Sequence, residues 1–367
     1  MINDPAVLDA IYSVKNDFPK SENQKTWLGY KNGEKIPGLA STQDKQEHGR
    51  LRKPVAAAYS MTNLAGLEPY VNQTIRYFVK RLNEEFISNN KACDIDNWLQ
   101  YCKSYSPYST TSAARNDAFT DTSTDAYDVI GELTFGRRLG FLEAGGDTDG
   151  SLADLNDEFS YRATVSNMPW IDYLVRRNAV MLRLRNYTSR FTQRAGAHIA
   201  ARMRSGAPDP TRRDLLAHFL EAQKAHPDIV TQNVLAGYTV APLLAGSDTT
   251  GVLLRSVLYF CLRNPRVLAR LRAELVSTSA DRELPVSYQK AIESPYLDAV
   301  IREASRHHAI GPGPLKRVVP DGHPGLVLPN GVRLPPGTTV GMAYYTLGKN
   351  KAVYGEDADV FLSLIHI

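Results

Sequence analysis

The sequence has few cysteines and no long apolar run. Its 367 residues include only three cysteines, Cys93, Cys102 and Cys261. They are too few and too scattered for a disulfide framework or a structural zinc site, so we predict a reduced, intracellular protein. No window reaches the roughly 18 apolar residues of a membrane-spanning helix. The start of the chain also lacks the basic and apolar regions of a signal peptide. We therefore expect the chain to be cytoplasmic and to carry no membrane anchor.

An excess of charge of one sign is also missing. Lys and Arg number 43 against 39 for Asp and Glu, and no block of five or six like charges occurs. This balance predicts no nucleic-acid partner. There is no Gly-rich phosphate loop and no alternation of strands and helices, which excludes a dinucleotide-binding fold and a P-loop enzyme.

Helical periodicity is the dominant pattern that is present. Strands are expected only within 318–340, where residues 329–331 (PNG) supply a hairpin turn. The residues from 17 to 38 are predicted to form a polar loop. The fold class predicted is mainly α with a small β component. The predicted helices cover 4–16, 43–67, 69–88, 127–136, 151–165, 168–205, 211–225, 230–262 and 265–276.

Residues 102–125 interrupt this pattern. They contain ten Ser and Thr in 24 positions and no Leu, Ile or Val, so they cannot build a core. Helical periodicity resumes at residue 127. We interpret the segment as an insertion into a structured stretch, of the kind that an unspliced intron read in frame would produce.

Residues 245–250 (AGSDTT) place a glycine, an acid and two hydroxyls inside an apolar helix. A mid-helix glycine costs about 1 kcal/mol relative to alanine, and a carboxylate between apolar turns costs more unless it is paired. One interpretation is a bulky ligand close to the backbone, with the acid and alcohol poised for proton transfer. The other is a hydroxyl that bonds back to its own helical turn.

Two further pairs have helical spacing. Glu303 and Arg306 lie three residues apart and can pair, although an exposed pair of this kind contributes at most ~0.5 kcal/mol. His48 and Arg52 place two hydrogen-bond donors on one helix face. Taken alone, each pair favours an ordinary solvated helix surface.

Taken in order, these three constellations, followed by residues 312–320 (PGPLKRVVP), resemble a cytochrome P450 of the fungal, microsomal, pisatin demethylase-like type. The resemblance runs from residue 2 to residue 361. It implies a haem-thiolate monooxygenase that inserts one oxygen atom from O2 into a small apolar organic substrate. NADPH would supply electrons through NADPH–cytochrome P450 reductase. Fungal secondary metabolism or detoxification is the implied setting, at the endoplasmic reticulum membrane.

The resemblance also implies roles for single residues. Asp248 and Thr249 would be the catalytic acid and alcohol that relay protons during oxygen activation. Ala245 and Gly246 would lie against the haem, with Gly246 opening space for oxygen. Three basic residues would bind the haem propionates, namely His48, Arg52 and Arg317. Glu303 and Arg306 would be a buried structural pair.

The sequence departs from the family in three places. We expect residues 1–361 to be a partial domain, without the first sheet strands and the haem-ligand cysteine loop, followed by a non-family tail at 362–367. Residues 102–125 would be a non-family insertion. The three cysteines match no ligand position, and no other metal ligand is predicted. The chain itself is therefore expected to be inactive, and the alternative is a noncatalytic, α-rich fragment without haem. A hydrolase is disfavoured because no nucleophile elbow is present.

Overall fold

A computed structural model describes residues 1–13, 15, 18–93, 95, 98, 125–147, 149–184, 187–206, 212–278, 284–311 and 313–361. Helices dominate this part of the chain, which confirms the predicted fold class. The expected insertion and tail, at 102–125 and 362–367, lie almost entirely outside the described residues. The α-helices are α1 (Leu8–Tyr12), α2 (Lys45–Arg52), α3 (Met61–Ala65), α4 (Glu68–Leu82), α6 (Asp125–Phe135), α7 (Phe141–Ala144), α8 (Ser151–Val165), α9 (Pro169–Asp172), α10 (Ala179–Leu184), α11 (Arg190–Ser205), α12 (Leu215–Ala225), α13 (Gln232–Arg263), α14 (Pro265–Thr278), α15 (Tyr288–Ile292), α16 (Pro295–His307), α17 (Tyr344–Leu347) and α18 (Lys351–Tyr354).

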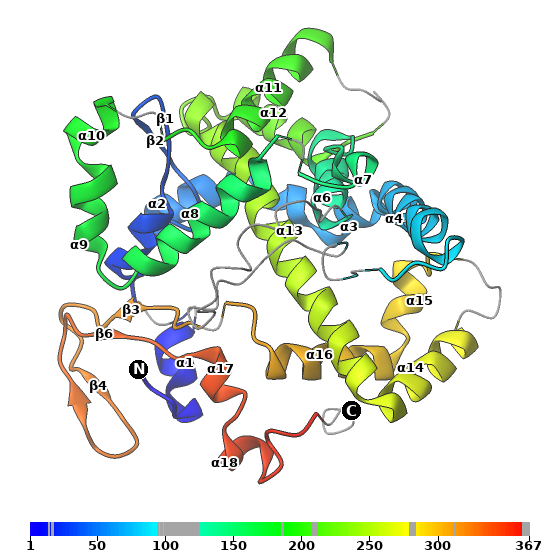
Figure 1. The fold of residues 1–367 in the computed structure, drawn as a ribbon. Coiled ribbons are helices and arrows are strands. Elements are labelled where there is room, and N and C mark those ends of the chain that lie inside the picture. Colours follow the sequence, from blue (N-terminus) through cyan, green and yellow to red (C-terminus); the bar gives the residue numbers. More distant parts are fainter. Residues whose placement is uncertain are drawn as a thin grey trace, which may run out of the picture.

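Helix α13 organises the fold. It crosses the molecule diagonally in Figure 1 and contacts α6, α11, α12, α14 and α16. The Thr231 side chain caps its first turn by accepting a hydrogen bond from the Val234 amide. Its N-terminal half is buried in the largest apolar cluster, where Leu235 and Leu243 are fully enclosed. The apolar run at 230–262 therefore forms one continuous helix, as predicted.

Shorter helical segments connect the α-helices. Two of them are π-helical turns that continue α4 and α9, and the others are 3₁₀ turns. They are η1 (Pro5–Val7), η2 (Glu22–Trp27), η3 (Lys53–Tyr59), η4 (Asn83–Ile87) and η6 (Tyr173–Arg177). The helix predicted at 168–205 is wrong as a single element, because it is divided into α9, η6, α10 and α11. Pro169 begins this series at the first turn of α9.

The strands form three two-stranded antiparallel sheets. They are β1 (Gly29–Lys31) with β2 (Glu34–Ile36), β3 (Arg317–Val318) with β6 (Thr339–Val340), and β4 (Leu326–Val327) with β5 (Arg333–Leu334). The β4–β5 hairpin turns at 329–331, as predicted. The loop predicted up to residue 38 is wrong at β1–β2. There, Asn32 and Gly33 both have positive φ, the geometry of a tight hairpin turn.

The beginning of the chain packs against its last third. Ile2 pairs with Met342, and Lys20 pairs with Arg317, as isolated bridges. The same contact buries an apolar cluster that contains Val7, Ile11, Phe18, Val319, Leu326, Val340 and Met342. Figure 1 shows α1 beside α17 at this junction. The position of Arg317 thus depends on the segment around Lys20, which is distant in sequence.

Long apolar helices of the membrane-spanning kind are not found in the described part of the chain.

Candidate functional site

Residues 245–250 lie on α13 and do not interrupt it. Ala245 and Thr249, four residues apart, are both exposed and share one face. The Thr249 hydroxyl donates to the Ala245 carbonyl at 2.7 Å. The hydroxyl thus bonds back to its own turn, which was one of the two interpretations of this motif. Its oxygen can still accept a hydrogen bond from a group on the exposed face.

Gly246 faces another helix. A Cβ built on this residue would come within 3.0 Å of the Ile130 side chain on α6. Glycine therefore permits the close approach of α6 to α13 at this point. Its expected role in opening space for oxygen remains a prediction.

Asp248 is half-buried on the same turn. One of its carboxylate oxygens accepts a hydrogen bond from the Tyr127 hydroxyl on α6, with 3.3 Å between the oxygens. Asp248 and Thr249 follow one another on the same turn, with the hydroxyl on the exposed face and the carboxylate directed toward α6. This arrangement can pass a proton between the protein interior and a ligand on that face.

Four basic side chains gather around helix α2. His48 and Arg52 come from α2, and the Lys20–Arg317 bridge brings in the other two. Burial lowers the pKa of His48, and the positive charges of Lys20 and Arg52 lower it further. Burial and the charge of Arg317 also lower the pKa of Lys20. These shifts show that the four groups, called here the basic cluster, act on one another.

Within the described residues, no carboxylate forms an ion pair with any member of the basic cluster. Two hydrogen bonds, to the carbonyls of Leu39 at 2.8 Å and Ala40 at 3.2 Å, fix the Lys20 ammonium. Concentrated positive charge without an internal counterion favours a bound anion, and arginine suits a carboxylate in particular.

Glu303 and Arg306 form a buried ion pair on α16. Their side chains are 1% and 7% exposed, and the guanidinium contacts both carboxylate oxygens, at 2.7 and 2.8 Å. The hydrogen bonds that Arg306 donates to the Glu303 carboxylate raise the pKa of Arg306. Arg306 also donates to the carbonyls of Gly348 at 2.7 Å and Ala358 at 2.5 Å. The pair therefore fastens the segment after α17 to α16.

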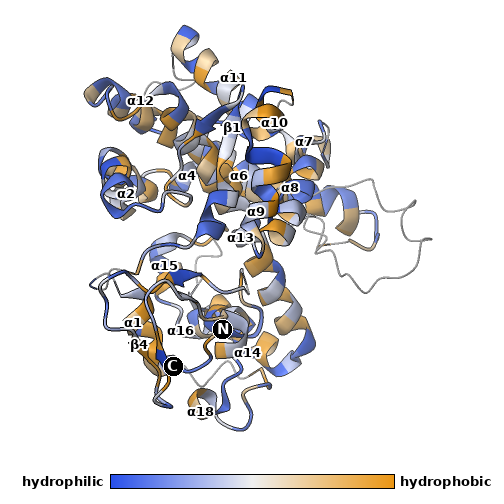
Figure 2. Cartoon of the chain, turned by 90° about the vertical axis from the view of Figure 1, so that its left-hand side faces the viewer, coloured by the Kyte–Doolittle hydropathy of each residue, from blue (hydrophilic) through white to orange (hydrophobic). Residues whose placement is uncertain are grey.

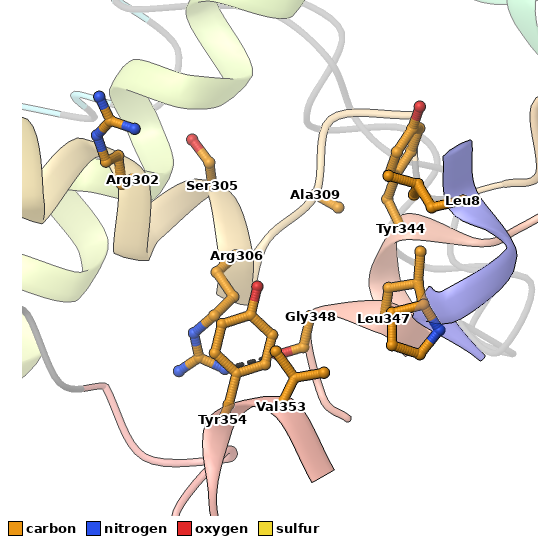
Figure 3. Close-up of a pocket in the computed structure, with 11 residues that line it drawn as sticks. Leu8, Arg302, Ser305, Arg306, Ala309, Tyr344, Leu347, Gly348, Val353 and Tyr354 are labelled. Atoms are coloured by element: carbon orange, nitrogen blue, oxygen red, sulfur yellow. Dashed lines mark hydrogen bonds between the residues drawn. The ribbon is translucent and has the colours of Figure 1, made fainter. Parts of the chain in front are cut away.

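A cavity of about 390 Å³ lies beside this pair. Figure 3 shows the Tyr354 ring next to the Arg306 guanidinium, with Leu347 and Leu8 on the opposite wall. None of the residues predicted to bind haem or transfer protons lines this cavity. Arg306 of the structural pair lines this cavity, and we do not regard the cavity as a candidate substrate pocket.

Two cysteines lie in the described part of the chain. Cys261, 2% exposed, is enclosed by Leu271, Tyr296 and Val300, and burial raises its thiol pKa. Cys93 packs against an apolar cluster that includes Trp98. Cys102 lies outside the described residues.

Sequence reasoning missed two residues of the site. Lys20 lies in a segment predicted to be a loop, and only the pairing with Arg317 shows that it joins the basic cluster. Tyr127 begins a helical pattern and looks like an ordinary core aromatic, although its hydroxyl reaches Asp248. A buried tyrosine hydroxyl needs a partner, which is the one signal that the sequence offered.

This chain is similar to known proteins in sequence and in fold. Residues 107–363 match the family model for cytochrome P450. A cytochrome P450 monooxygenase of Aspergillus terreus is 35% identical over 98% of this chain and 69% of its own length. Cytochrome P450 monooxygenase cicH of Emericella nidulans is 33% identical over 98% of this chain and 68% of its own length.

The chain also spans 63% of cytochrome P450 monooxygenase vrtE of Penicillium aethiopicum, to which it is 34% identical. A crystal structure of a cytochrome P450 superposes with a TM-score of 0.71 at 16% identity, covering 99% of this chain and 71% of that one. The family match begins inside residues 102–125, and the expected insertion there remains a prediction. The resemblance seen in the sequence is thus confirmed, and the chain belongs to the cytochrome P450 family.

Proposed function

We propose that these residues belong to a haem-thiolate monooxygenase that inserts one oxygen atom from O2 into a small apolar organic substrate. The observation that carries the proposal is the exposed Ala245–Thr249 face beside the Asp248 carboxylate. A second support is the basic cluster, which forms no ion pair with a carboxylate of the described residues and fits the two propionates of a haem. When bound, the haem would activate O2 through its iron.

The residues of this chain would do the rest. The basic cluster would hold the two propionates and so fix the plane of the haem ring. Its members are Lys20, His48, Arg52 and Arg317. Thr249 and Asp248 would hold and pass protons at the exposed face of α13. Electrons would come from NADPH through NADPH–cytochrome P450 reductase, and the setting would be fungal secondary metabolism or detoxification. Family membership supports these last two assignments.

Haem titration of the 367-residue polypeptide tests the cofactor site. Arg52→Ala and Arg317→Ala should each weaken haem binding by about tenfold, because each removes a charged donor to a propionate. The loss should shrink at high salt, which screens these charges. Soret absorbance against added haem gives the affinities.

Arg50→Ala is the matched control. Arg50 lies on the same helix as Arg52, but it pairs with Glu47 at 2.7 Å. Haem affinity equal in all three variants and the unmodified chain would contradict the propionate assignment.

The alternative, a noncatalytic polypeptide, has its own support from the cysteines. Cys261 lies twelve residues beyond Thr249, about 18 Å along a helix, and is enclosed by apolar side chains. Cys93 packs in a separate apolar cluster. We therefore propose that these 367 residues alone are inactive. The reduced carbon monoxide spectrum of the titrated samples decides the point, since a thiolate-type band would contradict it.

We also propose that the working location is the surface of the endoplasmic reticulum membrane. Support comes from an exposed apolar patch on α9, η6 and α10, hydrophobic along α10 in Figure 2. Its most exposed members are Trp170 (62%), Tyr173 (59%), Leu174 (61%), Val180 (64%) and Leu184 (74%). Apolar patches of this kind on a protein surface mark interaction sites, including membrane contacts.

Vesicle binding tests this location. Leu184→Asp should lower co-sedimentation with phosphatidylcholine vesicles by roughly tenfold or more, since burying a leucine side chain stabilises by ~1.5–3 kcal/mol. Val276→Asp is the control, because Val276 is 75% exposed but lies on α14. Equal losses in the two variants would argue against a patch that faces the membrane.

A further inference from the structure

Tyr127 is held rigidly on α6. Its side chain is 1% exposed and is enclosed by two aromatic rings. Phe141 meets it edge-on with the ring centroids 5.8 Å apart, and Phe191 stacks on it at 5.7 Å. Such contacts fix the plane of the ring, so the direction of the hydroxyl is set by packing.

The Tyr127 hydroxyl points to the acid of the α13 motif. It donates to an Asp248 carboxylate oxygen at 3.3 Å. That distance is long for a hydrogen bond between two oxygens, which usually measures about 2.7–2.8 Å, so the bond is weak. The close approach of α6 and α13 at Gly246 and Ile130 brings the two groups together.

We propose that Tyr127 is a positioning residue that turns the Asp248 carboxylate toward α6 and favours its ionised form. The tyrosine hydroxyl is the donor and the carboxylate oxygen the acceptor. Because the bond is weak, Asp248 can leave it when its carboxylate takes up a proton. It can then pass that proton to the Thr249 hydroxyl as the hydroxyl releases its own proton to a ligand on the exposed face. The effect of Tyr127 on catalysis rests on the proposed function. The Tyr127–Asp248 hydrogen bond itself, called here the tether, involves only residues of this chain.

Infrared titration of the full chain tests the tether without turnover. The difference spectrum between the unmodified chain and Asp248→Asn isolates the Asp248 carboxyl band, and its loss with rising pH gives the proton affinity. Tyr127→Phe keeps the ring contacts and removes one donor to the carboxylate. The proton affinity of Asp248 should therefore rise about threefold.

Tyr238→Phe is the matched control. Tyr238 is also a buried tyrosine, 3% exposed, and it lies on α13 itself, but it donates to the Leu51 carbonyl. Its loss should leave the Asp248 titration unchanged. An Asp248 titration that does not move in Tyr127→Phe, or that moves equally in Tyr238→Phe, would overturn the proposal.

A second measurement links the tether to chemistry. The sample for this measurement is a haem-loaded enzyme in which the chain is joined to a haem-ligand cysteine loop of the family. In it, Tyr127→Phe should lower the amount of product formed per NADPH consumed by a few fold, while substrate affinity stays the same. If the unmodified enzyme forms no product, the proposed function fails, and the infrared result still decides the tether. If product yield and titration are both unaffected by Tyr127→Phe, the tether fails and the proposed function stands.

Discussion

Replacing either Glu303 or Arg306 by alanine should lower the free energy of unfolding by about 3–5 kcal/mol, which is the cost of leaving one buried charge without its partner. Both side chains are almost completely buried, at 1% and 7% exposure, so water cannot compensate the remaining charge. Native stabilities are about 5–15 kcal/mol, and the variants should lose most folded, haem-binding protein.

Arg306 has an additional role that the pair alone does not reveal. Its donations to the Gly348 and Ala358 carbonyls depend on the planar fork of the guanidinium. Arg306→Lys keeps the charge but loses this geometry, so it should recover only part of the stability. In Arg306→Lys and in Arg306→Ala, the segment from Gly348 to Val360 should be the first to lose its protection from hydrogen exchange.

Urea unfolding and haem content measure these effects. The control is Arg302→Ala, because Arg302 pairs with Asp298 on the same helix at 2.6 Å, with side chains 66% and 58% exposed. An exposed pair contributes at most about 1 kcal/mol. A Glu303→Ala midpoint close to that of Arg302→Ala would refute the structural role of the pair.

Thr249→Ala and Asp248→Asn should reduce the rate of substrate oxidation by ~10²–10⁴-fold in an active, haem-loaded form, the usual contribution of a positioned proton donor. The Thr249 hydroxyl stands on the exposed face of α13, and Asp248 adjoins it from the α6 side. Water can replace part of the relay, which would place the losses toward the lower end of this range.

The diagnostic measurement is product formed per NADPH consumed, with haem content and substrate affinity beside it. NADPH should still be consumed, with its electrons diverted to hydrogen peroxide. Ser256→Ala is the control, because Ser256 bonds back to the Val252 carbonyl on the same helix but lies two turns away. A normal yield in both Asp248→Asn and Thr249→Ala would refute the proton-relay assignment.

Local patterns predicted much of this fold. Residues close in sequence determine the helix at 230–262 and the turn at 329–331. Both could therefore be predicted from short stretches of sequence. The Asn32–Gly33 hairpin carried an equally local signal that was overlooked among polar residues. By contrast, the division of 168–205 into α9, η6, α10 and α11 reflects tertiary packing that overrides helical periodicity.

The site was predictable where one helix carries it. Ala245, Asp248 and Thr249 share two turns of α13, so helical spacing alone placed them together. The basic cluster and the Tyr127–Asp248 contact join segments far apart in the chain, and no spacing rule reaches that distance. The buried state of Glu303 and Arg306 also needed the fold, since an exposed pair has the same spacing.

The pairing of residues 2–20 with residues 317–342 has a consequence during synthesis on the ribosome. Ile2 and Lys20 are translated long before their partners Met342 and Arg317. Throughout that interval the apolar side chains of Val7, Ile11 and Phe18 lack the residues that cover them. Chain segments that wait for distant partners are prone to aggregate. We therefore expect chaperones to bind the segment that carries Val7, Ile11 and Phe18 until residues 317–342 have been translated.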